Sequence, residues 1–174
     1  MNMEEKIPER KPTRARNYNY SSVGAYFVTI CTKNREEILS CIVGGDFLDA
    51  PIYTKMLPYG VIAEKYIKQL NDIYDNILVE KYVIMPDHIH IMIIVKKEKD
   101  TIRQNGASRT SPPTKQHSTL SRFVSTFKRF CNKECGENIW QESFYDHIIR
   151  NKEDYEEHIK YIHENPMKWY FENK

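Results

Sequence analysis

The stretch ILVEKYVIMPDHIHIMIIV, residues 77–95, decides the fold. Two runs rich in β-branched residues flank Pro86 and Asp87, and such runs joined by a tight turn predict a pair of antiparallel strands. In the second run isoleucine occupies every other position from residue 89 to residue 93. Because side chains alternate between the faces of a strand, these isoleucines share one face, and burial of that face fixes the register.

Further elements are predicted on both sides of this hairpin. Before it, YFVTICT (26–32) reads as a strand, residues 40–56 as irregular, and the segment after Pro58 as a helix of about 12 to 15 residues. After it come a helix with apolar residues at helical spacing from 120 to 131, a strand or extended segment (139–149) and a last helix. That helix is expected to be capped by Asn151 and to end before Pro166.

The order strand, helix, strand, strand, helix, strand, helix predicts an α+β fold. We expect a ferredoxin-like split βαβ antiparallel sheet with helices on one face and an extra C-terminal helix. The length of 174 residues suits one domain, here 21–174, after a flexible basic arm over residues 1–20. No apolar run has the roughly 20 residues of a membrane span, and no signal peptide is recognisable, so we expect a cytoplasmic, nucleoid-associated protein without a membrane partner.

Charge is unevenly distributed along the chain. Residues 97–133 hold nine basic and two acidic side chains, whereas the whole chain has a net charge of +2. Such a segment attracts phosphate backbones, although a solvated loop is the alternative, and residues 97–117 read as a polar loop. The candidate DNA contacts are Arg14 and Arg16 in the arm and Arg122, Lys128 and Arg129 in the following helix.

His88 and His90 are candidate metal ligands. Two residues apart on a strand, they leave the same face with Cα atoms roughly 6 to 7 Å apart, so both imidazoles can reach one ion. The alternative is a pair of structural histidines. Cys131 and Cys135 are one helical turn apart, and buried thiols are the expected interpretation over zinc ligands.

The last predicted helix has two sets of side chains on different faces. An apolar stripe is formed by Tyr155, Ile159 and Ile162, and a second set about 90° to its side by His158, Tyr161 and Asn165. Tyr161 is thus at the edge of the buried face, beside groups able to bind a metal or a hydrogen-bond partner. Without further context, an ordinary boundary tyrosine remains the alternative.

Three segments, MPDHIHIMIIV (85–95), WQESFYDHIIRN (140–151) and DYEEHIKYIHENPMKW (154–169), resemble the REP-associated tyrosine transposases. This is the single-tyrosine, IS200-like group of the HUH endonuclease superfamily. The resemblance implies that His88 and His90 bind the catalytic metal, that Asn165 completes its shell, and that Tyr161 is the nucleophile. It also implies cleavage and rejoining of single-stranded DNA at hairpin sites through a 5′-phosphotyrosine intermediate.

The resemblance and the donor types together indicate the cofactor and partners. Two imidazoles and an amide oxygen suit Mn²⁺ or, more loosely, Mg²⁺. Asp87 is a possible second-shell partner of a histidine or a cap of the hairpin, and His158 a possible base or a structural or DNA-contacting residue. The expected partner is single-stranded DNA carrying a hairpin, bound by a monomer or a homodimer.

Three other functions stay open at the level of sequence. Another HUH role, relaxase or replication initiator, would usually involve a longer chain. A zinc hydrolase built on His-X-His would need further ligands. A ferredoxin-like nucleic-acid-binding module without catalysis would keep the fold and lose the chemistry.

Overall fold

The computed structural model describes residues 23–44, 51–97 and 118–173. The N-terminal arm with Arg14 and Arg16, and the predicted loop apart from Lys97, lie outside these ranges. Four strands form one antiparallel sheet in the order β4-β5-β1-β6. They are β1 (Gly24–Cys31), β4 (Ile77–Ile84), β5 (His88–Val95) and β6 (Tyr145–Ile148).

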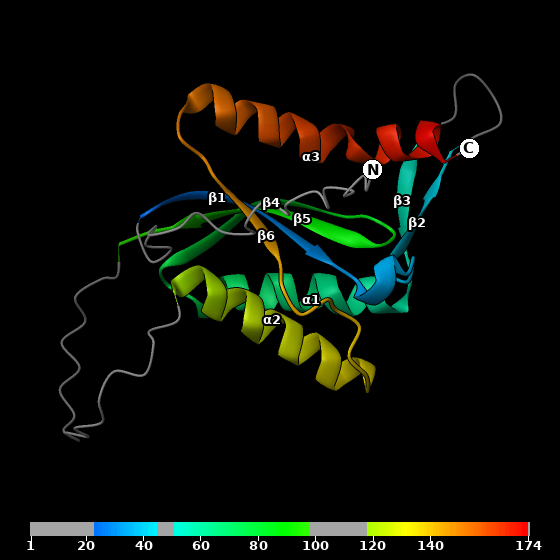
Figure 1. Cartoon of the computed structure of the whole chain (residues 1–174), viewed down its shortest axis with the longest axis horizontal. Helices are drawn as coiled ribbons and strands as arrows, with labels where there is room; N and C mark the ends of the chain where they lie inside the picture. The colour runs from blue at the N-terminus through cyan, green and yellow to red at the C-terminus, as the bar shows by residue number, and fades with distance from the viewer. Residues whose placement is uncertain (1–22, 45–50, 98–117, 174) are drawn as a thin grey trace, which may run out of the picture.

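The connections between these strands confirm the ferredoxin-like prediction. Helix α1 (Pro58–Ile73) joins β1 to β4 after a small hairpin, and α2 (Thr119–Cys135) joins β5 to β6. Both helices cover one face of the sheet, while α3 (Lys152–Glu172) runs along the other (Figure 1). The sheet is therefore enclosed between two helical layers.

The two faces of the sheet are buried by very different amounts of apolar surface. On the α1–α2 side, Ile89, Ile91 and Ile93 of β5 pack with residues such as Phe123 and Phe127 in a large core. On the α3 side, the buried apolar residues are Phe27, Met92 and Ile162, with a few half-buried residues packed around them. The main core therefore holds the sheet together, and a thin apolar layer holds α3.

The prediction that residues 40–56 are irregular was wrong. Strands β2 (Ser40–Val43) and β3 (Tyr53–Met56) pair with each other in a separate two-stranded sheet. Each strand has four residues, too few for a clear alternation. The chain before β2 passes so close to α1 that a Cβ atom at Gly60 would lie 1.9 Å from the Leu39 carbonyl oxygen, so glycine is required there.

The prediction that the last helix ends before Pro166 was also wrong, because α3 continues to Glu172. A proline inside a helix removes one hydrogen bond and costs about 3 kcal/mol. The residues after it compensate by tertiary contact: Trp169 packs against His88, and α3 lies against β2 and β3. Packing thus outweighs the local preference.

The predicted extended segment over residues 139–149 contains a shorter strand, since β6 covers only Tyr145–Ile148. Cys131 is fully buried in the main core, as expected, whereas Cys135 is only half-buried. All four cysteines are free thiols. Among the described residues, no helix combines the length and the apolar character needed to cross a membrane.

Candidate active site

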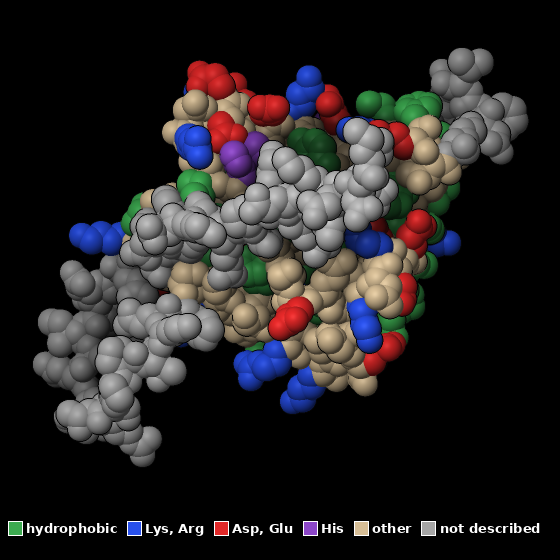
Figure 2. Space-filling view, in the orientation of Figure 1, with side chains coloured by type: hydrophobic (Ala, Val, Ile, Leu, Met, Phe, Trp, Pro, Cys, Tyr) green, Lys and Arg blue, Asp and Glu red, His purple; other side chains and the backbone are tan. Residues whose placement is uncertain are grey.

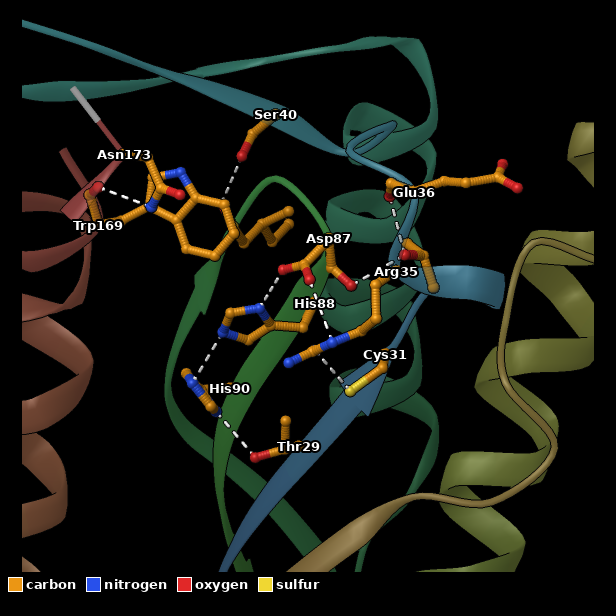
Figure 3. A network of polar contacts seen from close by, with 12 residues as sticks. Thr29, Cys31, Arg35, Glu36, Ser40, Asp87, His88, His90, Trp169 and Asn173 are labelled. Carbon is orange, nitrogen blue, oxygen red and sulfur yellow. Dashed lines mark hydrogen bonds and ion pairs between the residues drawn. The ribbon is translucent and has the colours of Figure 1, made fainter.

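The two histidines of β5 lie on the sheet face beneath α3 (Figure 3). Antiparallel pairing with β1 sets Thr29 opposite His90 and Cys31 opposite His88. Both histidines are buried, with 7% of His88 and 5% of His90 exposed. Their orientation is therefore determined by neighbouring protein groups.

Each imidazole is held through its outer nitrogen. The Nδ1 atom of His90 is 2.9 Å from Thr29 Oγ1, and the Nδ1 atom of His88 is 2.5 Å from Asp87 Oδ1. The two Nε2 atoms consequently point toward each other, 3.0 Å apart. This arrangement leaves the inner nitrogens available to share one partner.

Asp87 contacts both His88 and Arg35. Its Oδ2 atom is 3.2 Å from Arg35 Nε, and Arg35 also donates a hydrogen bond to Cys31 Sγ at 3.0 Å (Figure 3). Burial raises the pKa of Asp87, but the hydrogen bond with His88 and the charges of His88 and Arg35 outweigh it, so the pKa lies below its usual range. Asp87 is therefore a carboxylate at neutral pH.

His90 is held in its neutral form by burial. Burial, helped by the neighbouring positive charges of His88 and Arg35, lowers the pKa of His90 to about 3. A neutral imidazole keeps a lone pair on one nitrogen, which is the form that binds metal ions.

The distance between the two Nε2 atoms is compatible with a shared ion. Adjacent ligands at right angles around an ion, with bonds of about 2.1 Å, are about 3.0 Å apart. The observed separation is 3.0 Å. The histidine pair therefore fits a divalent metal without rearrangement of the strand.

Helix α3 places three side chains across the histidines. The Tyr161 ring centroid is 5.1 Å from that of His90, and the Trp169 ring centroid is 5.9 Å from that of His88. Asn165 lies four residues from each of these aromatic residues, on the same helix face, and is only 6% exposed. Tyr161, Asn165 and Trp169 thus follow one another over the candidate metal site.

A pocket with a volume of about 330 Å³ opens beside Tyr161. Its lining consists of Phe27, Thr29, His90, Glu157, His158 and Tyr161. His158 is fixed by its Nδ1 atom, 2.8 Å from the Asp154 carbonyl oxygen, and its ring lies against Phe27. Tyr161 is 39% exposed, so a substrate can reach the phenol from solvent.

The candidate DNA contacts of α2 lie away from this pocket. Arg122 and Arg129 are exposed on a helix that covers the opposite face of the sheet (Figure 1). The ammonium group of Lys128 donates hydrogen bonds to the carbonyls of Gln141, Glu142 and Ser143 at 2.7, 3.2 and 2.7 Å. Lys128 therefore fixes the segment before β6, and contact of these residues with DNA stays a prediction.

Sequence reasoning did not identify Thr29, Arg35 or Trp169. Thr29 becomes apparent only when β1 and β5 are put in register. Arg35 reaches Asp87 from a short 3-10 turn, η1 (Lys33–Arg35), where its φ of 60° is uncommon for a residue other than glycine. Trp169 was excluded by the expected end of the helix.

The chain is similar over most of its length to proteins of two bacteria. No protein-family model matches it. It is 29% identical over 171 residues to an uncharacterized protein of Haemophilus influenzae, covering 94% of this chain and 91% of the relative. It is 26% identical over 150 residues to a protein of Escherichia coli K12 named REP-associated tyrosine transposase, covering 86% of this chain and 70% of the relative.

A solved structure shares the fold. The structure of a REP-associated tyrosine transposase bound to a REP hairpin aligns with 89% of this chain and 73% of its own, with a TM-score of 0.58 and 22% identity. Together, these relatives confirm the resemblance inferred from the three sequence segments.

Proposed function

We propose that this chain is a REP-associated tyrosine transposase that cleaves and rejoins single-stranded DNA at hairpin sites. Similarity to a protein of that name over 86% of the chain supports the assignment. The observation that carries it is the meeting of Tyr161 with the histidine pair: its ring centroid is 5.1 Å from that of His90, whose Nε2 atom is 3.0 Å from that of His88.

Tyr161 is proposed as the nucleophile. Its phenolic oxygen forms a bond to a DNA phosphorus while the bond from that phosphorus to the 3′ oxygen breaks. The phenolic proton passes to solvent, the departing oxygen takes up a proton, and the products are a 5′-phosphotyrosine and a free 3′-hydroxyl. Attack by a 3′-hydroxyl reverses the step and joins strands without ATP, because the covalent link keeps the phosphodiester bond energy.

His88, His90 and Asn165 would hold Mg²⁺ or Mn²⁺. The ion would supply Lewis-acid polarisation of the scissile phosphate. Asp87 and Thr29 orient the imidazoles through their outer nitrogens, and Asp87 would thereby keep His88 aimed at the ion. His158 borders the same pocket one turn before Tyr161, where it can contact the DNA or receive the phenolic proton.

The proposed partner is a DNA hairpin with an unpaired strand at its foot. A relative of the same fold is described as bound to a REP hairpin, and a ring-lined pocket suits an unstacked base or sugar beside the phenol. Arg14 and Arg16 in the arm, with Arg122 and Arg129 in α2, are proposed as phosphate contacts. Lys128, which the sequence also suggested, uses its three N–H donors on main-chain carbonyls instead. One chain already joins the tyrosine to the histidines, so the reaction needs no tyrosine from a second copy.

The test is formation of a covalent protein–DNA adduct. The protein is incubated with Mn²⁺ and labelled single-stranded hairpin oligonucleotides taken from the flanks of its own gene, and the products are separated on a denaturing gel. The wild type should give an adduct that disappears with a chelator and in the variant Tyr161→Phe. A binding module without catalysis would retain hairpin affinity and give no adduct.

Tyr155→Phe is the matched control. Tyr155 lies on the same helix, but its hydroxyl donates to Glu80 Oε1 at 3.2 Å, and its ring packs in the apolar layer. This variant should keep the adduct. An adduct that persists in Tyr161→Phe and is lost in Tyr155→Phe would overturn the assignment of the nucleophile.

A further inference from the structure

A second group of metal-binding side chains lies beside the pocket. His147 comes from β6, and Asp154 and His158 come from the first two turns of α3. Their candidate ligand atoms all lie within 4.8 Å of one another. Histidine side chains are visible at the surface beside α3 (Figure 2).

We propose that His147, Asp154 and His158 form a second metal site, which takes a transition-metal ion of the Zn²⁺ type. Two imidazoles and one carboxylate are a common protein ligand set for zinc, with a further position left open. The Asp154 Oδ1 atom is 2.9 Å from His147 Nε2 and 3.1 Å from His158 Nδ1. Ligands bound at 2.0–2.1 Å to one ion are about 2.9 to 3.4 Å apart, so both histidine–carboxylate spacings already suit a shared ion. To bind it, His158 Nδ1 would have to give up its hydrogen bond to the Asp154 carbonyl oxygen, 2.8 Å away.

The three side chains are ordered by their surroundings and remain accessible. The rings of His147 and His158 stack with centroids 4.6 Å apart and planes at 12°, and the Asp154 carboxylate accepts a hydrogen bond from Arg150 N at 2.9 Å. The side chains of His147, Asp154 and His158 are 45%, 17% and 21% exposed. An ion can therefore enter from solvent into a set of ligands already gathered.

Hydrogen bonding alone would explain the same distances. Asp154 lies at the start of α3, where its N–H donates to the capping residue Asn151. His147 could simply donate to its carboxylate and His158 to its main-chain carbonyl oxygen. A metal requires lone pairs on both nitrogens, whereas these hydrogen bonds require N–H groups. A metal-binding measurement therefore distinguishes a metal site from a cluster held by hydrogen bonds alone.

The site would have a structural consequence for the helix that carries Tyr161. It would link the edge strand β6 to the start of α3, and its ligand His158 lies one turn before Tyr161 and lines the same pocket. A bound ion would therefore fix the helix to the sheet and add positive charge at the pocket.

The experiment is metal titration of the full-length, metal-free protein. Zn²⁺ binding is followed by calorimetry and by equilibrium dialysis with metal analysis, and Co²⁺ binding by its visible absorption. His147→Asn is the main variant because this exposed side chain can change without disturbing the core. It should bind one equivalent less than the wild type at the same free metal concentration, as should His158→Asn.

His163→Asn is the matched control, since His163 is an exposed histidine of α3 outside the cluster. It should bind as many ions as the wild type, whereas loss of a direct ligand should weaken the site by more than the roughly 10- to 100-fold that an outer-shell partner costs. Equal stoichiometry and affinity in the wild type, His147→Asn and His158→Asn would overturn the proposal. Because no DNA is involved, the result is independent of the proposed transposase activity.

Discussion

Asp87 combines three tasks at one position. Its carboxylate contacts His88 and Arg35, and its main-chain carbonyl accepts hydrogen bonds from the amide and hydroxyl of Thr32. The carbonyl contacts do not depend on the side-chain charge. A substitution of the carboxylate therefore changes the orientation of His88 while the loop stays anchored.

We expect Asp87→Asn to weaken Mn²⁺ binding at the histidine pair by about 10- to 100-fold, because the partner that orients His88 is lost. Calorimetric titration in the wild type and the variant measures the change. Glu36→Gln is the control, since Glu36 is an exposed carboxylate near Arg35 whose Oε1 atom accepts a hydrogen bond from Asn34 Nδ2 at 3.5 Å. Unchanged affinity in Asp87→Asn would show that His88 is oriented by packing alone.

Residue-level prediction succeeded where the signal was periodic and failed where it depended on register. The strand period placed His88 and His90 on one face, and the helical period with the resemblance singled out Tyr161. Thr29 is 61 residues from its partner His90, and no local pattern reports that distance. The position of the Arg35 side chain depends on a left-handed backbone conformation that the local sequence does not predict.

At the scale of elements, α3 owes its defined start to a cap. The Asn151 side chain accepts a hydrogen bond from the Asp154 backbone amide at 2.8 Å. We expect Asn151→Ala to lower the free energy of unfolding by about 1 kcal/mol, the usual cost of a lost cap. Urea titration followed by circular dichroism measures it.

Ser118→Ala is the comparison for the cap of α3, because Ser118 caps α2 in the same way through Ser121 N. Both caps should matter to stability, but only Asn151→Ala should reduce adduct formation, since α3 alone carries Tyr161. Equal loss of adduct in both variants would contradict a specific role for the start of α3.

Helix α1 is tied to β4 through Glu64. Its Oε1 atom accepts hydrogen bonds from Tyr82 and Lys68, each at 3.0 Å. The hydrogen bond from Lys68 is the main cause that lowers the pKa of Glu64 from its usual 4.5, helped by Tyr82 and opposed by burial. A folded-state pKa below the unfolded one means that the stabilisation is present above about pH 4.5 and lost as the pH falls through the folded-state pKa.

We therefore expect Glu64→Gln to reduce stability at pH 7 by up to about 1 kcal/mol, because the pair is partly exposed, and to have a smaller effect at pH 3. Urea unfolding at the two pH values checks this. Glu156→Gln removes an exposed i,i+4 partner of Lys152 that lacks a tyrosine donor, and it should change little. The same loss at both pH values would mean that shape rather than charge matters at Glu64.

Long amphipathic elements were predictable, and short or proline-containing ones were not. The predicted α1, α2, β4 and β5 match the structure closely because many periodic residues define each of them. Strands β2 and β3 have four residues each and depend on mutual pairing. The continuation of α3 past Pro166 depends on contacts of Trp169 that no local rule contains.

At the scale of the whole molecule, the basic side chains of α2 and the histidine pair face opposite directions from the sheet. Arg122→Ala combined with Arg129→Ala should therefore weaken hairpin binding without lowering the adduct yield at saturating DNA. Two lost phosphate contacts should reduce the slope of log affinity against log salt by about 1.4 for single-stranded DNA. Fluorescence anisotropy at several salt concentrations measures the slope.

A charge-matched control is Lys55→Ala combined with Lys96→Ala, which removes two exposed positive charges outside α2. If both double variants shift the slope equally, net charge rather than the surface of α2 governs binding. A fall in adduct yield at saturating DNA for the α2 variant would place these arginines at the cleaved strand.

The unequal apolar layers on the two sides of the sheet predict unequal local stability. Backbone amides of α3 should exchange with deuterium faster than those of α1 and β5, because α3 rests on a few buried apolar residues while α1 belongs to the main core. Hydrogen exchange followed by mass spectrometry provides the comparison. Equal protection of α3 and β5 would mean that the helix opens only on global unfolding.

The thin apolar layer under α3 allows the position of the helix to change separately from the stability of the sheet. Met92 and Ile162 help hold the helix but are not among the residues that line the pocket. The main core, on the other face of the sheet, supplies most of the buried apolar surface that stabilises the fold. Smaller side chains at these two positions should let Tyr161 move away from the histidine pair more often, while the main core keeps the sheet folded. Mutations at Met92 and Ile162 can therefore change the rate of the proposed strand cleavage without altering the side chains proposed to bind the metal or the DNA.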